Sequence, residues 1–216
     1  MSGDPAPDLV SIPPGARAVI MLGHGAGSPM TSPLLGGFCG AMGASGIGTY
    51  RFNFPYMAAG RRAPDRAPVL IEAYRRAHAR AAQAAGGLPL FAGGRSMGGR
   101  IASMAVAEGM AAAGLVFLAY PLHPPGRPDR IRDEHLYGIS VPMLFIQGSR
   151  DAFAQPQLLR SVLDRLGERA ELAEIEGADH GFRRAGGERD AARIGTALAG
   201  PAARFVDRVL RDGTVG

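Results

Sequence analysis

Continuous apolar runs alternate with stretches of helical spacing from one end of the chain to the other. Short apolar runs bounded by turn residues are typical of buried strands, and apolar positions three and four residues apart are typical of helices. We predict strands over residues 16–22, 49–54, 88–92, 115–119, 142–147 and 170–175. We predict helices over residues 33–44, 67–85, 101–113, 155–166 and 188–211, the last with a candidate break at Gly200 and Pro201.

This alternation predicts an α/β fold. Parallel strands need crossover connections, which cover both faces of the sheet with helices. We therefore expect a mostly parallel sheet of about six or seven strands with helices on both faces. The 216 residues, 46% of them hydrophobic, suffice for one substantial core. Residues 1–15 hold four prolines and predict an extended surface arm, and residues 16–216 predict a single domain.

Composition excludes several functions. All 24 basic residues are Arg, and they are scattered among acidic residues, so we favour a solvated surface over a nucleic-acid partner for the net charge of +5. Without Lys, a Walker A loop, a Lys Schiff base and a Ser-Lys dyad are all excluded.

Cys39, the single cysteine, excludes an intrachain disulfide and fits a buried small residue better than a second nucleophile. No signal segment or membrane span is present, so we expect a cytoplasmic protein with no membrane partner.

One motif points to chemistry. Residues 94–98 match G-x-S-x-G, and they follow a predicted strand and precede a predicted helix. A sharp strand-to-helix turn of this kind exposes the serine hydroxyl over the end of a sheet. The pattern alone carries little weight in a chain with 32 glycines, but its context makes Ser96 the candidate nucleophile.

A glycine-rich loop over residues 23–27 follows the first predicted strand. Its small residues let backbone N–H groups point toward a developing negative charge, as an oxyanion hole requires. A dinucleotide fingerprint and a plain turn are the alternatives. The fingerprint needs glycine at Ser28 and a helix where Pro29 and Pro33 stand, so we favour the oxyanion hole.

Two further candidates follow later strands. Asp151 comes just after the predicted strand 142–147, and His180 after the strand 170–175. Each has an ordinary alternative, a turn residue for the aspartate and a surface residue for the histidine. The order Ser96, Asp151, His180 is nevertheless that of the α/β-hydrolase triad, and ligands gather at the carboxyl ends of parallel strands. We read neighbouring Asp179 as a loop residue.

Other residues on the same edge have two interpretations each. His24 borders a pocket or, as we favour, supports its turn, and Arg95 either steers an anionic substrate or forms an outward salt bridge.

The segment 121–138 is the one connection long enough for a partial cover, so we expect no large lid domain. The five histidines lack metal-ligand spacing, and we expect neither metal nor cofactor. The candidate pocket residues are His24, Arg51, Asn53, Tyr56, Arg95 and His123, with fold support as the alternative for Arg51, Asn53 and Tyr56.

In combination these motifs resemble the α/β-hydrolase superfamily, and specifically its small dienelactone-hydrolase-like branch with predicted hydrolases of the KANL/Tex type. The resemblance covers nearly the whole chain. One departure is that dienelactone hydrolase uses a cysteine nucleophile, whereas this chain carries Ser96, so its substrate cannot be carried over. The strings that carry the resemblance are GHGAGS at residue 23, RFNFPY at 51, GGRSMGGR at 93, YPLHPPG at 120, QGSRD at 147 and ADHGF at 178.

The resemblance implies acyl transfer to water. His180 takes the Ser96 proton, Asp151 orients the imidazole, and the N–H groups of Met97 and Ala26 bind the oxyanion. We expect a serine hydrolase, carboxylesterase-like, that cleaves a small ester through an acyl-enzyme. The alternative is a hydrolase-fold module with little or no activity that binds a ligand or a protein.

Overall fold

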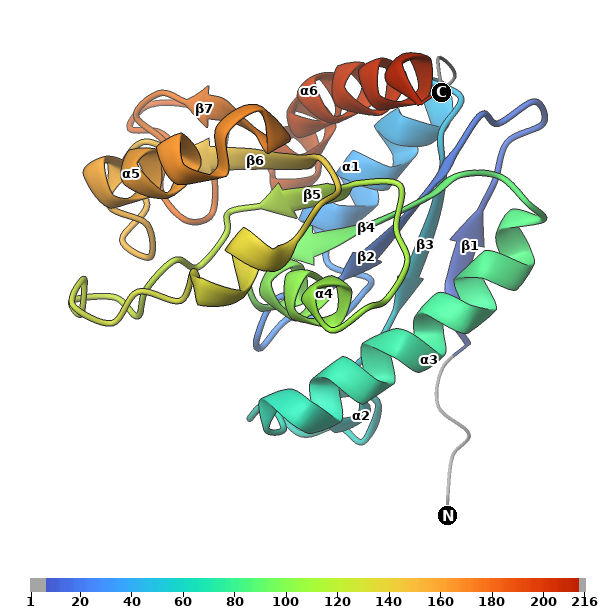
Figure 1. The fold of residues 1–216 in the computed structure, drawn as a ribbon, viewed down its shortest axis with the longest axis horizontal. Coiled ribbons are helices and arrows are strands. Elements are labelled where there is room, and N and C mark those ends of the chain that lie inside the picture. Colours follow the sequence, from blue (N-terminus) through green and yellow to red (C-terminus); the bar gives the residue numbers. More distant parts are fainter. Residues whose placement is uncertain (1–6, 214–216) are drawn as a thin grey trace.

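A central sheet with helices on both faces forms the protein, as the computed structural model of residues 7–213 shows (Figure 1). The strands run in the order β1-β3-β2-β4-β5-β6-β7, and all pairs are parallel except the antiparallel pair of β1 with β3. The α/β prediction is thus confirmed. The strands are β1 (Leu9–Ser11), β2 (Val19–Gly23), β3 (Gly48–Phe52), β4 (Leu90–Arg95), β5 (Leu115–Leu118), β6 (Met143–Gly148) and β7 (Ala170–Ile175).

The helices follow the predicted alternation. Three predicted helices agree with the structure to within one residue, and two differ. The helix after residue 96 ends at Ala107 instead of near Ala113, and α6 continues through Pro201 without the candidate break. The helices are α1 (Pro33–Ala44), α2 (Pro55–Ala58), α3 (Ala67–Ala85), α4 (Met97–Ala107), α5 (Pro156–Leu166) and α6 (Ala191–Asp212), with 3-10 turns η1 (Glu134–Gly138) and η2 (Gly167–Arg169).

Strand β1 lies inside the segment 1–15 that we expected to be an arm. It is extended, as predicted, but it pairs with β3 from Leu9 opposite Arg51 to Ser11 opposite Thr49. The segment therefore adds an edge strand to the sheet instead of lying free of it. The remainder of the predicted arm, residues 1–6, lies outside the described residues, and the domain boundary stays a prediction.

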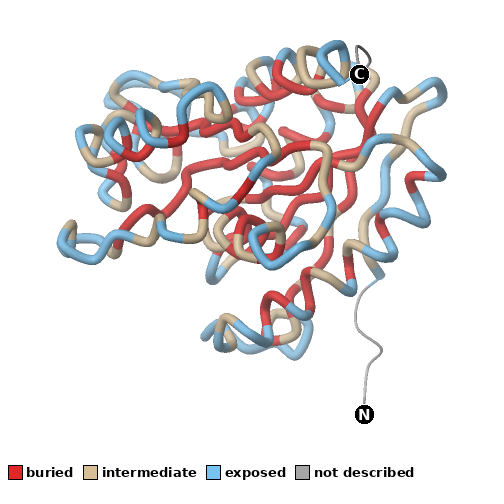
Figure 2. The backbone as a smooth tube through the Cα atoms, in the orientation of Figure 1, coloured by how far each residue is buried: buried red, intermediate tan, exposed pale blue. Residues whose placement is uncertain are grey.

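Two apolar cores lie on opposite faces of the sheet, and buried positions follow the strands (Figure 2). On β2, Val19 and Met21 face the core shared with α3, α4 and α5, whereas Ile20 and Leu22 face the core shared with α1 and α6. This period of two on a strand buried on both faces explains the continuous apolar runs in the sequence. The sheet is thus fixed from both sides.

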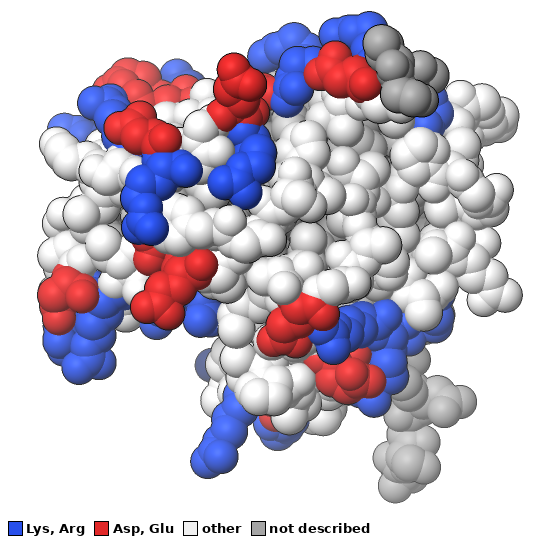
Figure 3. All heavy atoms as spheres, viewed as in Figure 1, with Lys and Arg blue, Asp and Glu red and all other residues white. Residues whose placement is uncertain are grey.

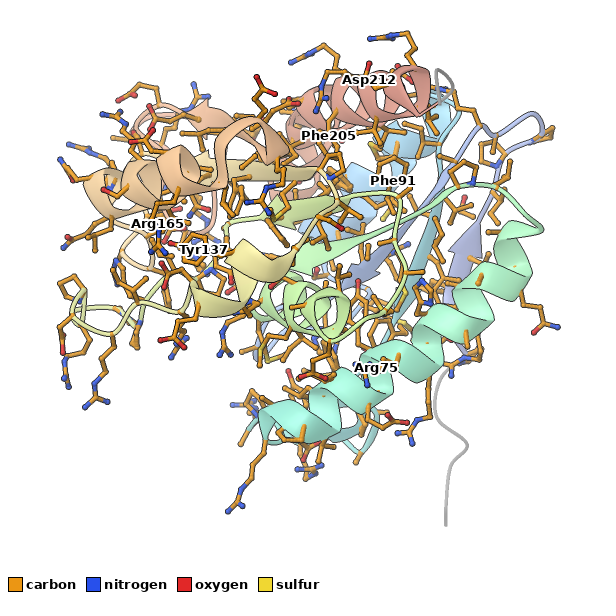
Figure 4. All side chains as sticks on the ribbon, viewed as in Figure 1. Arg75, Phe91, Tyr137, Arg165, Phe205 and Asp212 are labelled. Atoms are coloured by element: carbon orange, nitrogen blue, oxygen red, sulfur yellow. The ribbon has the colours of Figure 1, made fainter. Side chains whose placement is uncertain are left out.

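Aromatic side chains join the helices to this sheet (Figure 4). Phe91 on β4 packs edge-on against Phe205 on α6, with ring centroids 6.2 Å apart. On the other face, the Arg165 guanidinium of α5 lies 3.7 Å from the centroid of the Tyr137 ring in η1. The first contact attaches α6 to the central strand β4, which leads into the candidate site, and the second joins α5 to η1.

The surface view in Figure 3 has acidic and basic side chains interspersed on the visible face. Several form ion pairs, for example Arg75 with Glu108 at 3.0 Å and Arg17 with Asp207 at 2.7 Å. Within residues 7–213, no helix is both long enough and apolar enough to cross a bilayer. The absence of a nucleic-acid partner stays a prediction.

Candidate active site

The turn at Ser96 sits at the carboxyl end of β4, the middle strand of the sheet. Ser96 has φ 49° and ψ −115°, in the left-handed half of backbone space that side chains disfavour, and α4 begins at the next residue. Its N–H donates to the Leu118 carbonyl oxygen at 2.9 Å, which ties the strained residue to the end of β5. The local structure is the strand-turn-helix that the sequence predicts.

Glycines at positions 94 and 98 let this turn contact the loop after β2. A Cβ on Gly94 would lie 2.3 Å from the Gly23 carbonyl oxygen, and one on Gly98 would lie 2.2 Å from the same atom. Both approaches are backbone against backbone, so no flexible side chain can move aside. The two loops are therefore fixed relative to each other by the absence of side chains at these positions.

We expect Gly98→Ala to lower the free energy of unfolding by about 1–3 kcal/mol, because the added methyl group overlaps the Gly23 carbonyl. The matched control is Gly40→Ala in α1, where a Cβ meets nothing within 4 Å. A helical glycine in open space gains stability on replacement, by about 0.5–1 kcal/mol. Urea denaturation of both variants measures the difference, and equal stabilities would contradict the close approach.

Ser96, His180 and Asp151 form a hydrogen-bonded row across the carboxyl ends of β4, β6 and β7. The Nε2 atom of His180 lies 2.9 Å from the Ser96 Oγ, and its Nδ1 lies 2.7 Å and 2.9 Å from the two Asp151 carboxylate oxygens. Nδ1 donates to the carboxylate, which leaves Nε2 free to accept the serine proton. The structure brings together the three residues that the sequence nominated separately.

The Asp151 carboxylate is buried, and three donors surround it. Besides His180, the Gln147 Nε2 donates to it at 2.5 Å and the Phe153 backbone N–H at 2.8 Å. The Gln147 Oε1 in turn accepts the Tyr120 N–H at 2.8 Å, so this side chain bridges the ends of β5 and β6. These hydrogen bonds replace water around the carboxylate and fix its orientation.

The loop that carries His180 is held at its main chain. The Asp179 carboxylate accepts the N–H groups of Gly181 at 2.8 Å and of Arg183 at 2.9 Å, as expected of a loop residue. The Arg95 Nη2 donates to the His180 carbonyl oxygen at 3.3 Å. Both contacts place the histidine above the nucleophile without using its ring nitrogens.

Arg95 had two interpretations, and the structure places its guanidinium against the His180 loop and Gly25 instead of in an outward salt bridge. Its guanidinium lies against Gly25, where a Cβ would come within 2.8 Å of Nη1. Burial lowers the pKa of Arg95, while the charges of Asp151 and Asp179 act against that shift. Among the described residues, the one hydrogen bond that the Arg95 guanidinium donates goes to the main chain beside the proposed base, so Arg95 supports the His180 loop.

His24 supports its turn, the interpretation that we favoured. Its Nε2 accepts the Phe54 N–H at 3.0 Å, so the proton is on Nδ1, which faces the Gly25 carbonyl oxygen at 2.9 Å. The ring is fully buried, and this burial lowers its pKa. His24 thereby joins the glycine loop to the chain that leaves β3.

Arg51 and Asn53 support the same loop. The Arg51 Nη1 donates to the Met30 carbonyl oxygen and the Asn53 Oδ1 accepts the Met30 N–H, both at 2.9 Å. Tyr56 is fully buried, with its ring edge-on to His24 at 5.8 Å. Asn53 also lines a cavity of about 730 Å³ between β3, α2 and α3, but Ser96 is not in its lining.

The two backbone N–H groups predicted to bind the oxyanion, those of Met97 and Ala26, have no acceptor among the described residues. Met97 begins α4, and the first N–H groups of a helix have no acceptor within it. Within the described part of the chain, neither the Met97 N–H nor the Ala26 N–H donates a hydrogen bond. Their function as oxyanion donors stays a prediction. Among residues 7–213 there is no group of three His, Cys, Asp or Glu side chains able to hold a metal ion.

The segment 121–138 is attached to the protein at two histidines. The His123 N–H donates to the Phe153 carbonyl oxygen at 2.9 Å, and its Nε2 accepts the Gln155 N–H at 3.0 Å. The His135 Nε2 lies 2.8 Å from the Ser103 Oγ on α4. His123 is thus a structural link between this segment and the loop of Asp151.

We expect the stability of the protein to fall as pH drops from about 7 to about 4. Burial, together with the Arg100 charge, lowers the pKa of His135 from 6.5 to about 4. Below pH 6.5 the unfolded chain binds a proton that the folded protein excludes, so the loss begins there and ends near pH 4. Because the His135 ring is partly solvated, it contributes only about 1 kcal/mol to this loss in the free energy of unfolding.

The free energy of unfolding at about pH 7 and pH 5 measures this effect in the wild type and in His135→Gln. The variant has no proton to bind at this position, so its stability falls less between the two values. Other buried groups, including His24 and His78 with their lowered pKa values, still contribute in both proteins. An identical fall in the two proteins would show that His135 does not titrate as described.

Comparison with known proteins supports the fold and shows the family to which the chain belongs. A family profile described as an alpha/beta hydrolase domain matches residues 16–205. The chain is similar in structure to a dienelactone hydrolase from Anabaena variabilis, with a TM-score of 0.73 and 22% identity over 93% of this chain and 90% of that one. It is also similar to an alpha-beta serine hydrolase homologue from Coxiella burnetii, with a TM-score of 0.71 and 17% identity over 92% and 90% of the two chains.

A third similar structure bears on the cover of the site. It is described as a serine hydrolase without lid, from Xanthomonas campestris, and has a TM-score of 0.68 and 21% identity over 92% of this chain and 88% of that chain. This chain likewise carries no large lid domain, because its longest connection near the site is the short segment 121–138.

Proposed function

Because the chain belongs to the alpha/beta hydrolase family, we propose that it is a serine hydrolase that cleaves a small ester through an acyl-enzyme. The observation that carries this proposal is the hydrogen-bonded row of Ser96, His180 and Asp151, with contacts of 2.9 Å and 2.7 Å. Ser96 sits in a strained turn at the end of a central strand, and strain of this kind concentrates at active sites.

In the first half of the reaction, the Ser96 Oγ attacks the ester carbonyl carbon while its proton passes to the His180 Nε2. The carbonyl oxygen becomes an oxyanion, and the buried Asp151 carboxylate stabilises the imidazolium that forms. Collapse of the tetrahedral intermediate breaks the bond to the alkoxy group, which leaves as an alcohol with the proton from His180. The acyl group remains on Ser96.

In the second half, a water molecule attacks the acyl-enzyme. His180 takes a proton from this water, and the second tetrahedral intermediate releases the carboxylic acid as the proton returns to Ser96. The N–H groups of Met97 and Ala26 are the oxyanion donors in this proposal. Two observations support this assignment. Neither N–H group donates a hydrogen bond to a described residue, and Gly94 and Gly98 bring the start of α4 against the end of β2, which precedes Ala26. Loss of one such donor costs about 100- to 1000-fold in rate.

The size of the proposed substrate follows from the cover of the site. The segment 121–138 is bound to the Asp151 loop through His123 and to α4 through His135. It is therefore held beside the site, and the rim near Ala26 is exposed. An open site of this kind favours a small or accessible ester over a long chain that needs an enclosed tunnel.

Turnover of p-nitrophenyl acetate tests the proposal. We expect hydrolysis with release of nitrophenolate in an initial burst if deacylation is slow, followed by a steady rate. Esters of graded acyl length, thioesters and lactones then define the preferred bond, and kcat/KM is expected to fall as the acyl chain lengthens. A protein that hydrolyses none of them but binds one would support a binding module instead. A cytoplasmic location remains part of the proposal.

A further inference from the structure

One aromatic ring covers a face of the proposed catalytic base. The Phe153 ring stacks on the His180 imidazole with centroids 4.2 Å apart and an angle of 30° between the planes. Phe153 stands two residues after Asp151, in the loop between β6 and α5. Phe153 is half-buried, and its ring covers one face of the imidazole.

The main chain of the same residue contacts the acid and the cover segment. The Phe153 N–H donates to the Asp151 Oδ1 at 2.8 Å, and its carbonyl oxygen accepts the His123 N–H at 2.9 Å. The Gln155 N–H closes this connection by donating to the His123 Nε2 at 3.0 Å. The main chain of Phe153, from which the ring projects, is therefore fixed by hydrogen bonds on both sides of its Cα.

The other contacts of His180 restrain its main chain and its two ring nitrogens, and Phe153 adds a restraint on one face of the ring. Arg95 and the Asp179 carboxylate hold the main chain of the loop. The hydrogen bonds at Nδ1 and Nε2 fix two points on the ring, but a terminal torsion between sp³ and sp² atoms has a broad energy minimum. The Phe153 ring, 4.2 Å away, narrows the range of this torsion. A tilt of the imidazole in one direction would lose the contact, and a tilt in the other would bring the two rings into a clash.

We propose that Phe153 is a positioning residue of the hydrolase, which keeps the His180 ring in the plane of proton transfer and favours its charged form. This inference rests on the proposed function. An imidazolium over an aromatic face gains about 0.5–2 kcal/mol from cation–π attraction, and the neutral ring gains less. Since His180 becomes charged only as Ser96 attacks, this gain acts on the transition state and raises kcat without tightening substrate binding.

Three variants test the inference on the intact protein. Phe153→Leu fills much of the same space without an aromatic face, Phe153→Tyr retains that face, and Tyr137→Leu is the matched control at an aromatic residue in η1. For p-nitrophenyl acetate we expect kcat to fall about 3- to 30-fold in Phe153→Leu with little change in KM. Phe153→Tyr restores most of that loss, and Tyr137→Leu leaves kcat near the wild-type value.

A second measurement does not depend on turnover. In the wild type, the ring current of Phe153 moves the NMR signal of the His180 Cε1 proton upfield. We expect this displacement to disappear in Phe153→Leu and to persist in Phe153→Tyr and Tyr137→Leu. An unchanged signal in Phe153→Leu would show that the stack is absent in solution and would overturn the inference.

The kinetic outcomes separate this inference from the proposed function. If the wild type is active and Phe153→Leu matches Phe153→Tyr in kcat, the positioning role is wrong while the hydrolase stands. The same holds if KM alone changes, or if kcat falls only in step with the free energy of unfolding measured in urea. If the wild type is inactive on every ester and does not react with a fluorophosphonate, the proposed function fails and this inference fails with it.

Discussion

Ser96→Ala lowers the turnover of p-nitrophenyl acetate by a factor of about 10⁴ to 10⁶ and leaves the fold intact, on the mechanism proposed above. The variant lacks the oxygen that attacks the carbonyl carbon, and His180 then has no hydroxyl proton to accept. Only oxyanion binding remains to assist attack by water. The Ser96 hydroxyl lies at the carboxyl edge of the sheet and belongs to neither core, so the free energy of unfolding stays near the wild-type value.

Ser103→Ala is the matched control for this variant. Ser103 lies on α4, the helix that follows Ser96. Its Oγ likewise contacts a histidine nitrogen, the His135 Nε2, at 2.8 Å. It is fully buried, however, so an ester cannot reach it. We expect Ser103→Ala to keep kcat within a few-fold of the wild type. Activity that survives in Ser96→Ala but is lost in Ser103→Ala would move the nucleophile to the buried pair.

The second large effect concerns the carboxylate. Asp151→Asn is expected to lower kcat by about 10⁴, because an amide cannot reproduce the hydrogen bonds of Asp151. The carboxylate accepts from the His180 Nδ1, the Gln147 Nε2 and the Phe153 N–H at once. An asparagine places an NH₂ group against one of these donors, and it favours the histidine tautomer whose Nε2 carries a proton and cannot accept one from Ser96.

Asp179→Asn provides the comparison for this change. Asp179 is adjacent to His180, but its Oδ1 accepts only main-chain N–H groups in its own loop. The amide oxygen of asparagine can accept the same bonds, so we expect kcat within a few-fold of the wild type. Steady-state kinetics near pH 8 measures both variants. Equal losses in the two would show that Asp179 matters as much as Asp151 and would contradict the role of Asp151 in the row with Ser96 and His180.

The sequence could predict the positions of these three residues because each follows a parallel strand, largely buried in β4 and β6 and half-buried in the edge strand β7. The carboxyl ends of parallel strands meet at one edge of the sheet. The predicted strand before Ser96 corresponds to β4, and those before Asp151 and His180 correspond to β6 and β7. What spacing could not supply was the distance between side chains, which depends on how the loops pack.

The elements that the sequence missed depend on contacts distant along the chain. Strand β1 has three residues, too few for a period of two to show, and it is ordered by pairing with β3. Helix α4 ends before an apolar stretch because Gly109 takes a φ of 94° and turns the chain. Helix α6 continues through Pro201 because its packing against α1 and the sheet outweighs one missing hydrogen bond.

Gln147 and Phe153 were also outside the residues predicted from sequence. Gln147 is a polar residue in an otherwise apolar strand. This pattern indicates a buried hydrogen bond, but it does not identify the partner. Phe153 is an aromatic residue in a loop, where nothing local distinguishes a core contact from a ring stacked on a histidine. The contacts of Gln147 with Tyr120 and of Phe153 with His180 join residues far apart in the sequence, so only the fold brings them together.

The central claim is that Ser96 is an activated nucleophile. Reaction with a fluorophosphonate probe, followed by digestion and mass spectrometry of the labelled peptide, tests this most directly, because phosphonylation requires an activated hydroxyl and does not require knowledge of the substrate. If Ser96 is activated by His180 and Asp151, we expect stoichiometric labelling of Ser96. The labelling should be absent in Ser96→Ala and strongly slowed in Asp151→Asn. A protein that stays unlabelled, or that is labelled at a different residue, would contradict it.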